Sequence, residues 1–223
     1  MKVVVIGHNE GKSVSNIINS FAKYWNVVYV ADRCTDNTLE ELLDGRKNGG
    51  LLVVLEVDLD FGGRLTSHCR NLGGRFLGME DEEGVCFFDG DRYPIDGSIE
   101  EAIKACSSDI LLFRVEDDFR TKEDFKINYG RVYNGFFSCG MWMSKKAYDR
   151  ISEFQGGEIF RTDMQWWWGI EDTYLGDVCY HLGLSAELCD TVTLNGTFER
   201  NTLDSLDVIE KRLRERSKLD VKW

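Results

Sequence analysis

KVVVIGHNEGKSVSNIINSFAKYWNVVYVA, residues 2–31, contains two valine-rich runs with a longer mixed segment between them. Each run is apolar at consecutive positions, which is typical of a strand buried on both faces of a parallel sheet. The segment between them has apolar residues at the spacing of one helix face, namely Val14, Ile17, Ile18 and Phe21. This order of strand, helix and strand predicts a parallel α/β unit.

The alternation continues as far as residue 115. We expect helices at 37–45, 65–79 and 97–107, and strands at 50–58, 84–88 and 109–115. Asn37 is a suitable cap for the first of these helices and Gly45 a suitable end. The sequence therefore predicts an α/β fold with right-handed crossovers and a ligand site at the carboxyl ends of the strands.

The second half has a different pattern. Residues 136–151 predict a strand that leads into a helix, residues 170–184 an amphipathic helix with acids in its first turn, and residues 202–218 a charged terminal helix. No internal repeat or linker separates the two halves. One domain is therefore expected.

Composition limits the classes of protein that fit. The chain has 223 residues, 43% of them hydrophobic, and its formal net charge of −12 argues against broad binding of nucleic acid, although local basic patches are compatible with it. No apolar run approaches the roughly 20 residues that span a bilayer, and the first run is too short for a signal peptide. We therefore expect a cytoplasmic protein that is not an integral membrane protein. The seven cysteines include no C-x-x-C pair, so we expect reduced thiols rather than a zinc site or disulfides.

GVCFFDGDRYP, residues 84–94, ends an apolar strand with two aspartates. Asp89 and Asp91 can reach one hard cation together if the backbone turns sharply at Gly90. The alternative is a polar strand end in solvent. Acids also follow other strands, at Asp58 and at 116–118, so the spacing alone does not identify a metal site.

Five motifs in order resemble glycosyltransferase family 2, whose members have the GT-A fold. They are GHNE, ADRCTDNT, HCRNLGGRF, FFDGDR and WWWGIEDTYLG, and the resemblance spans residues 2–185. It implies a single GT-A domain over 1–223, with a Rossmann-like, mostly parallel sheet flanked by helices. Residues 1–115 would bind the nucleotide sugar, residues 116–200 would bind the acceptor and carry the catalytic acids, and residues 201–223 would form a C-terminal helix.

The resemblance assigns residues to the donor. It implies that Asp32 accepts hydrogen bonds from the base of a nucleotide sugar, that Glu10 lies near the nucleoside, and that Arg70 and Asn71 line the donor pocket. Capping of the next helix is the alternative role for Asp36, and a surface salt bridge is the alternative for Arg70.

The position of Asp89 and Asp91 in the family pattern selects them as ligands of Mn²⁺ or Mg²⁺. Such a cation acts as a Lewis acid on the departing diphosphate. Many relatives add a histidine after the Glu-Asp helix, but residues 191–201, TVTLNGTFERN, contain none. We therefore expect a metal held by Asp91, Asp89, the diphosphate and water, with weak affinity before the donor binds.

The resemblance also assigns the acceptor side. It makes Asp172 the base that takes a proton from an acceptor hydroxyl, and Glu171 the neighbour that helps to hold the acceptor. The alternative is that both acids lie in a first helical turn because the helix dipole favours them. Trp168 is expected near the acceptor, although large aromatics are more often core residues. Gly140 is expected to let the backbone approach the donor sugar, and tight packing explains it equally well.

The predicted activity is transfer of a hexosyl or pentosyl group from a UDP-sugar, or another nucleoside diphosphate sugar, to a hydroxyl group. A single displacement would invert the anomeric centre. The acceptor would be a glycan, a lipid-linked sugar, a protein or a modified base. Two alternatives are a nucleotidyltransferase of related fold, which needs a basic amino-terminal loop where this chain offers only Lys12, and an inactive carbohydrate-binding protein.

Overall fold

The computed structural model describes residues 1–22, 25–47, 52–59, 65–78, 84–116, 118, 121–123, 125, 139–164 and 170–196. Within these residues eight strands form one sheet in the order β3-β2-β1-β4-β7-β6-β8-β5. The strands are β1 Lys2–Gly7, β2 Asn26–Asp32, β3 Leu52–Val57, β4 Val85–Asp89, β5 Pro94–Asp96, β6 Ile110–Val115, β7 Gly140–Met143 and β8 Ala186–Leu194. The helices are α1 Gly11–Ile17 with the π-helical η1 Ile18–Ala22, α2 Thr38–Lys47, α3 Thr66–Leu77, α4 Ile99–Ala105, α6 Lys145–Phe154, the 3₁₀ helix η2 Thr162–Met164, and α7 Ile170–His181.

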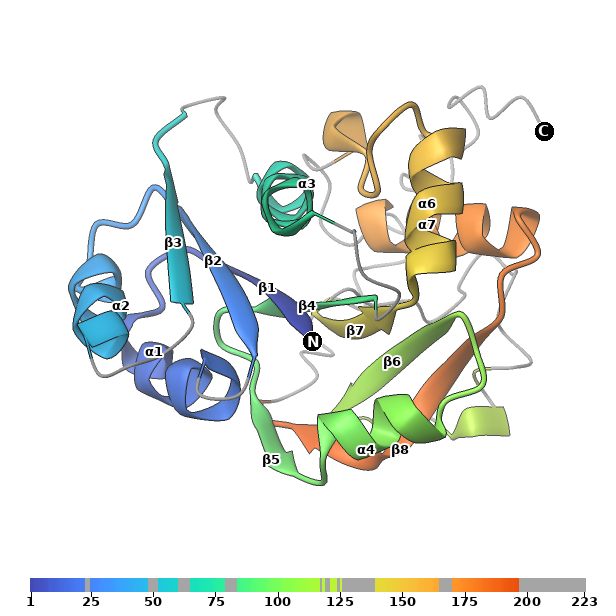
Figure 1. Cartoon of the computed structure of the whole chain (residues 1–223), viewed down its shortest axis with the longest axis horizontal. Helices are drawn as coiled ribbons and strands as arrows, with labels where there is room; N and C mark the ends of the chain where they lie inside the picture. The colour runs from blue at the N-terminus through green and yellow to red at the C-terminus, as the bar shows by residue number, and fades with distance from the viewer. Residues whose placement is uncertain are drawn as a thin grey trace, which may run out of the picture.

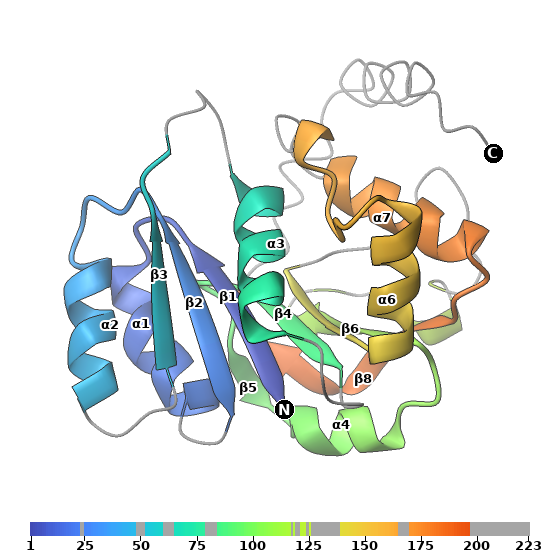
Figure 2. The ribbon, with the colours of Figure 1, turned by 45° about the horizontal axis from the view of Figure 1, so that its top comes forward.

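The first half of the sheet is parallel, as predicted. Strand β1 pairs with β2 and β4, and β2 pairs with β3, all in the parallel sense. Alternate residues of β1 enter two separate cores: Val4 joins the core beneath α3, whereas Val3 and Val5 join the core beneath α1 and α2. Burial on both faces explains why these strands are continuously apolar. Figures 1 and 2 show α3 on one face of the sheet and α1 with α2 on the other.

The second half of the sheet is mixed. Strand β7 pairs antiparallel with both β4 and β6, β8 runs parallel to β6, and β5 pairs antiparallel with β8. The predicted strand and helix within 136–151 correspond to β7 and α6, and the helix predicted at 170–184 corresponds to α7. Strand β8 was not predicted, because polar residues such as Asp190 interrupt its apolar pattern where its register with β6 shifts. The terminal helix predicted at 202–218 lies outside the described residues.

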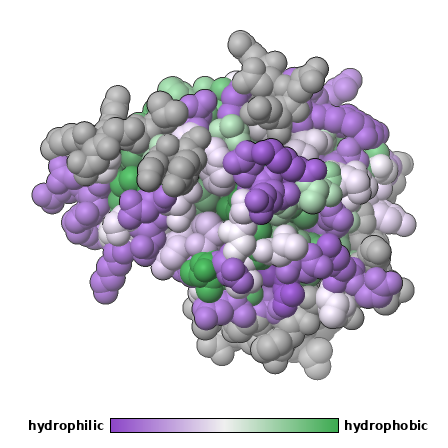
Figure 3. All heavy atoms as spheres, turned by 60° about the horizontal axis from the view of Figure 1, so that its bottom comes forward, coloured by the Kyte–Doolittle hydropathy of each residue, from purple (hydrophilic) through white to green (hydrophobic). Residues whose placement is uncertain are grey.

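None of the helices in the described ranges is long and apolar enough to cross a bilayer. The face that carries β5, α4 and β8 is mostly hydrophilic, with strongly hydrophobic colour confined to small areas (Figure 3). All seven cysteines lie in described segments and are free thiols.

Candidate active site

The loops after β1, β2 and β4 lie side by side at one edge of the sheet. Gly7 pairs with Ala31 of β2, and Ile6 pairs with Asp89 of β4. The backbone N–H of Gly90 donates to the carbonyl of Ile6 at 2.6 Å. Because parallel strands present their carboxyl ends at the same edge, the residues expected to bind the nucleotide sugar are brought together there.

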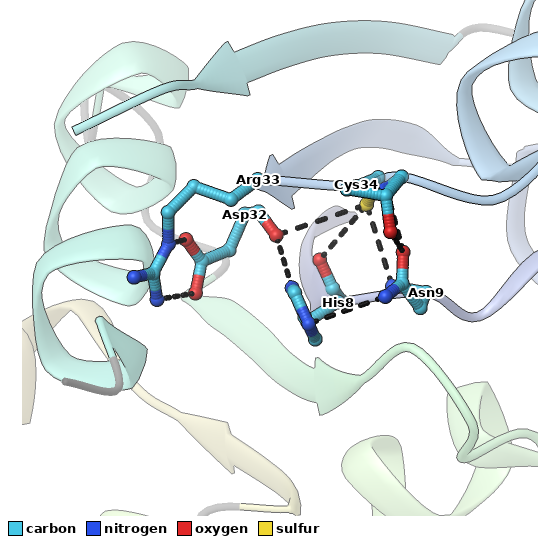
Figure 4. A network of polar contacts seen from close by, with 7 residues as sticks. His8, Asn9, Asp32, Arg33 and Cys34 are labelled. Atoms are coloured by element: carbon cyan, nitrogen blue, oxygen red, sulfur yellow. Dashed lines mark hydrogen bonds and ion pairs between the residues drawn. The ribbon is translucent and has the colours of Figure 1, made fainter. Parts of the chain in front are cut away.

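A polar network fastens the first two loops to each other (Figure 4). Asn9 has a left-handed backbone (φ 60°), and its Oδ1 accepts hydrogen bonds from the backbone N–H groups of Thr35 (2.7 Å) and Asp36 (3.2 Å). His8 Nδ1 lies 2.6 Å from the carbonyl oxygen of Asp32. A carbonyl only accepts, so Nδ1 carries the proton and Nε2 accepts from Asn9 Nδ2 at 3.3 Å. The side chains of His8 and Asn9 therefore connect the loop after β1 to the loop after β2.

Asp32 is largely buried at the end of β2, with 9% of the residue exposed. Arg33 grips both of its oxygens, with Nε 2.7 Å from Oδ1 and Nη2 3.0 Å from Oδ2. Sequence reasoning missed Arg33, because nothing in the pattern indicated that it turns back on its neighbour, and its φ of 45° makes that turn possible. A nucleotide base at Asp32 would share the carboxylate with this guanidinium.

Asp36 has the capping role that was its alternative. Its carboxylate accepts hydrogen bonds from the backbone N–H and hydroxyl of Thr38, and from the backbone N–H of Gly11 at 3.1 Å. The hydroxyl of Thr38 lowers the pKa of Asp36 more than any other neighbour does. Asp36 thus binds the starts of α1 and α2 together.

Asp89 and Asp91 present partly exposed carboxylates at the end of β4, with 34% and 44% of their side chains accessible. The chain does turn at the glycine between them, where the backbone N–H of Arg92 donates to the carbonyl of Asp89 at 2.9 Å, but this turn does not use glycine's conformational freedom. Gly90 does not have a positive φ; instead, a Cβ at this position would lie 2.5 Å from the hydroxyl of Tyr29 and 3.1 Å from the Cα of Gly7. The turn is therefore present, and close packing over Tyr29 is the reason that a glycine is required in it.

Glu10 adds a third carboxylate to this edge. Its Cγ lies 3.1 Å from the position that a Cβ on Gly90 would take. Burial, followed by the negative charges of Asp91 and Asp89, raises the pKa of Glu10. Negative charge is therefore concentrated where a divalent cation would offset it, and the exposed oxygens suit Mn²⁺ or Mg²⁺. No group of three or more protein ligands within the described segments is placed to hold a metal unaided, so the donor set fits a metal that also takes phosphate and water oxygens.

Arg70 connects this edge with the start of α7. Only 3% of it is exposed, which excludes the surface salt bridge considered for it. One terminal nitrogen, Nη2, donates to Asp89 Oδ1 at 2.7 Å, and the other, Nη1, lies 3.9 Å from Asp172 Oδ1. The guanidinium also lies 5.3 Å from the ring centre of Phe160. Burial alone would lower the pKa of Arg70, but Asp89, Asp172 and Glu171 outweigh it and raise that pKa.

The two acids of α7 occupy different environments. Glu171 is 7% exposed; Thr66 Oγ1 donates to its Oε1 at 3.5 Å, while its Oε2 has no hydrogen-bond partner among the described residues. Burial, with a further contribution from Asp172, raises the pKa of Glu171 to about 8. The side chain of Asp172 is 15% exposed and lies near Arg70. The pair therefore offers one carboxyl group that favours its proton and one carboxylate next to a cation.

The contacts of Asn71 and Gly140 are with neighbouring backbone and with a packed side chain. The amide of Asn71 donates to the carbonyl of Phe160 (2.6 Å) and accepts from the N–H groups of Ile159 and Phe160 (3.0 Å each), so it supports backbone instead of lining a pocket. A Cβ on Gly140 would lie 2.2 Å from Leu194 Cδ1, as the packing alternative requires. Trp168 lies outside the described residues.

Comparison with known proteins identifies the fold. No protein-family model matches the chain, and no curated protein matches it in sequence. Among solved structures it is similar to TarS of S. aureus in complex with UDP (TM-score 0.62, 19% identity, 96% of this chain and 65% of that one). It is similar to the mannosyltransferase PcManGT of Pyrobaculum calidifontis in complex with GDP-Man and Mn²⁺ (TM-score 0.63, 13% identity, 97% and 64%). It is also similar to a nucleoside-diphosphate-sugar pyrophosphorylase of Vibrio cholerae (TM-score 0.51, 14% identity, 96% and 100%).

These likenesses confirm the GT-A type fold predicted from the motifs. The chain spans just under two thirds of the length of the first two proteins. The mannosyltransferase and the pyrophosphorylase are named for different reactions, so the fold does not decide the chemistry and the site has to.

Proposed function

We propose that this protein is a metal-dependent glycosyltransferase that moves a sugar from a nucleoside diphosphate, UDP in the first instance, to an acceptor hydroxyl group. The observation that carries the proposal is the placement of two acidic pairs on either side of one buried cation. Asp89 and Asp91 lie at the end of β4, Glu171 and Asp172 lie at the start of α7, and Arg70 contacts both groups. Sugar transfer needs such a pairing, because a diphosphate must leave on one side and a hydroxyl must lose its proton on the other.

The donor side consists of the loops after β1, β2 and β4. Asp91 and Asp89 would hold Mn²⁺ or Mg²⁺, which when bound supplies positive charge to the leaving diphosphate. Asp32 and Glu10 are the proposed contacts to the base and nucleoside. The similar TarS structure holds UDP, and the similar mannosyltransferase structure holds GDP-Man and Mn²⁺, which supports this class of ligand.

On the acceptor side, Asp172 is the proposed general base. Its carboxylate would take the hydroxyl proton as the acceptor oxygen attacks the anomeric carbon, and a single displacement would invert that centre. Glu171, with its raised pKa, keeps a proton near neutral pH and can donate a hydrogen bond to the acceptor. Arg70 offsets the negative charge that Asp89 and Asp172 bring together.

The site disfavours a nucleotidyltransferase. That class needs a basic loop for a triphosphate near the amino terminus, but here the first loop places Glu10 against Gly90, between Asp89 and Asp91. Lys12 is exposed on α1. A binding protein without activity would not need a buried arginine shared between two acidic pairs.

UDP release from UDP-sugars, with and without Mn²⁺, tests the proposal. We expect Mn²⁺-dependent release that is lost in Asp91→Asn and reduced at least a hundredfold in Asp172→Asn. Asp58→Asn is the matched control, because Asp58 is an exposed acid just after β3, and it should leave the rate unchanged. Pyrophosphate release from a nucleoside triphosphate, with no UDP released from any sugar donor, would overturn the assignment.

A further inference from the structure

The segment that follows β8 is bound to the turn that carries Asp91. Asn195 Nδ2 donates to the carbonyl oxygen of Asp91 at 2.8 Å, and Asn195 Oδ1 accepts from the backbone N–H of Tyr93 at 2.7 Å. Both ends of one side-chain amide thus hold one turn. The residues joined are 104 positions apart in the first of these bonds.

The side chain of Asn195 takes the place of a main-chain group. Strands β5 and β8 pair antiparallel at Pro94 and Leu194, and the next residues continue the ladder, since the N–H of Asn195 donates to the carbonyl of Tyr93 at 2.9 Å. The return bond from the N–H of Tyr93 goes to the side-chain oxygen. As a result the amide nitrogen reaches the carbonyl of Asp91, two residues before Tyr93. A side-chain amide suits this position because it carries an acceptor and a donor on one rigid plane.

Arg92 completes the contact from the other side. Its Nη1 donates to the carbonyl oxygen of Asn195 at 3.2 Å, and its Nε lies 3.7 Å from Asp91 Oδ1. Gly196 makes room for this guanidinium: its φ is 96°, and a Cβ there would lie 1.7 Å from Arg92 Nη1. Asn195 and Gly196 together therefore fix the backbone and the neighbouring charge of Asp91.

We propose that Asn195 is a positioning residue for the metal ligand Asp91. It stands in the segment where a further metal-binding side chain was expected and not found, and its amide is directed at the backbone of the turn. Holding the turn lets Asp91 present its carboxylate to a divalent cation without first being ordered, which strengthens binding. Groups that orient a metal ligand typically change metal affinity by about 10- to 100-fold. This inference rests on the proposed role of Asp91 in metal binding.

The test measures the affinity of the full chain for Mn²⁺ in the presence of UDP. Calorimetry gives this affinity directly, and electron paramagnetic resonance gives it from the concentration of free Mn²⁺. In Asn195→Ala we expect Mn²⁺ affinity to fall about 10-fold or more. The Asn195→Asp variant separates positioning from charge. An added negative charge alone would tighten Mn²⁺ binding, whereas loss of the hydrogen-bond donor to the Asp91 carbonyl would weaken Mn²⁺ binding. We expect this variant to bind Mn²⁺ more weakly than the parent chain. Asn16→Asp, on the exposed face of α1, is the control and should bind Mn²⁺ as the parent chain does.

Thermal unfolding of the metal-free variants separates positioning from general stability. A purely structural role would lower the melting temperature of Asn195→Ala and leave the Mn²⁺ affinity of the folded fraction unchanged, which would overturn the inference. An Mn²⁺ affinity of Asn195→Asp that equals or exceeds that of the parent would overturn it as well, and that comparison remains decisive if the alanine variant does not fold. Failure of the parent chain to bind Mn²⁺ with UDP would instead remove the proposed function, and the inference with it.

Discussion

Arg70 is a buried cation placed between carboxylates from two elements that are distant in sequence. Its partners are Asp89 at 2.7 Å and Asp172 at 3.9 Å. Its Nε and Nη1 have no hydrogen-bond acceptor among the described residues. A buried charge without a partner of opposite charge destabilises the fold, so Arg70 and its two carboxylate partners each reduce the cost of burying the other.

Replacing Arg70 with methionine should therefore destabilise the protein. We expect the free energy of unfolding to fall by about 3 kcal/mol, at the lower end of what broken buried pairs cost because Asp89 is partly exposed. Urea unfolding measures this value. Arg75→Met on the exposed face of α3 is the control and should change it by less than about 0.5 kcal/mol. Equal effects of the two substitutions would contradict the bridging role.

Glu171 makes the stability of the protein depend on pH. Its pKa is about 8 in the folded protein and 4.5 as the ordinary value, so the folded state holds a proton that the unfolded state has lost between these limits. Stability is therefore highest below about pH 4.5 with respect to this group and falls as pH rises toward about 8.

Glu171→Gln should remove that dependence. We expect the variant to gain stability relative to the parent as pH rises from about 5 to about 8, by on the order of 1 kcal/mol or more. Unfolding curves of metal-free protein at several pH values give the difference. The control is Glu153→Gln, at an exposed position of α6, whose stability should change with pH as that of the parent does. A gap between Glu171→Gln and the parent that stays constant with pH would refute the burial argument.

At the scale of elements, the end of β4 rests on the side chain of Tyr29 from β2. The Tyr29 hydroxyl is buried and has no hydrogen-bond partner within the described part of the chain, and burial raises the pKa of Tyr29. The same hydroxyl lies where a Cβ on Gly7 or Gly90 would be, at 2.0 and 2.5 Å. The two loops that carry Glu10 and Asp91 are thus held close to the sheet by glycines.

Gly90→Ala should displace the loop and cost about 2 kcal/mol of stability through overpacking. Tyr29→Phe should be neutral or stabilising, since it removes a buried group without a partner, and it should reduce the cost of Gly90→Ala because it removes the colliding atom. A double-mutant cycle measures that coupling. Strict additivity of the two changes would show that the hydroxyl is not the obstacle.

At the scale of the whole molecule, the proposed donor site consists of the ends of three strands and the proposed acceptor site of the start of α7. A ligand that contacts both sites binds the folded chain and not the unfolded chain, so it stabilises the folded state. At a ligand concentration 100 times its Kd this linkage amounts to about 2.7 kcal/mol.

UDP and Mn²⁺ added together should therefore raise the melting temperature, and Mn²⁺ alone should raise it much less, because the described residues offer no group of three protein ligands. Differential scanning fluorimetry with each ligand and with both checks this expectation. Asp91→Asn should abolish the joint effect, whereas Asp58→Asn should retain it. A large shift with Mn²⁺ alone, still present in Asp91→Asn, would place the metal elsewhere.

Much of the first half could be predicted because its signals are local. Continuous apolar runs identified β1, β2, β3, β4 and β6, and helical spacing identified the helices between them. Acids directly after buried strands pointed to the edge where Asp32, Asp89 and Asp91 lie. The short β5 and the interrupted β8 were not predicted, because their pairing with each other and with β6 depends on residues far apart in the chain.

The sequence by itself determined the order of strands and helices, and with it the edge of the sheet at which the acidic side chains gather, since both follow from the local pattern of apolar and polar residues. Only the tertiary structure decided what those side chains contact. It placed Arg70 between Asp89 and Asp172, gave Asn71 to the backbone of residues 159–160, set Gly90 over Tyr29, and bound Asn195 to the turn of Asp91. Such contacts depend on close packing between distant segments, and no local pattern of residues records that packing.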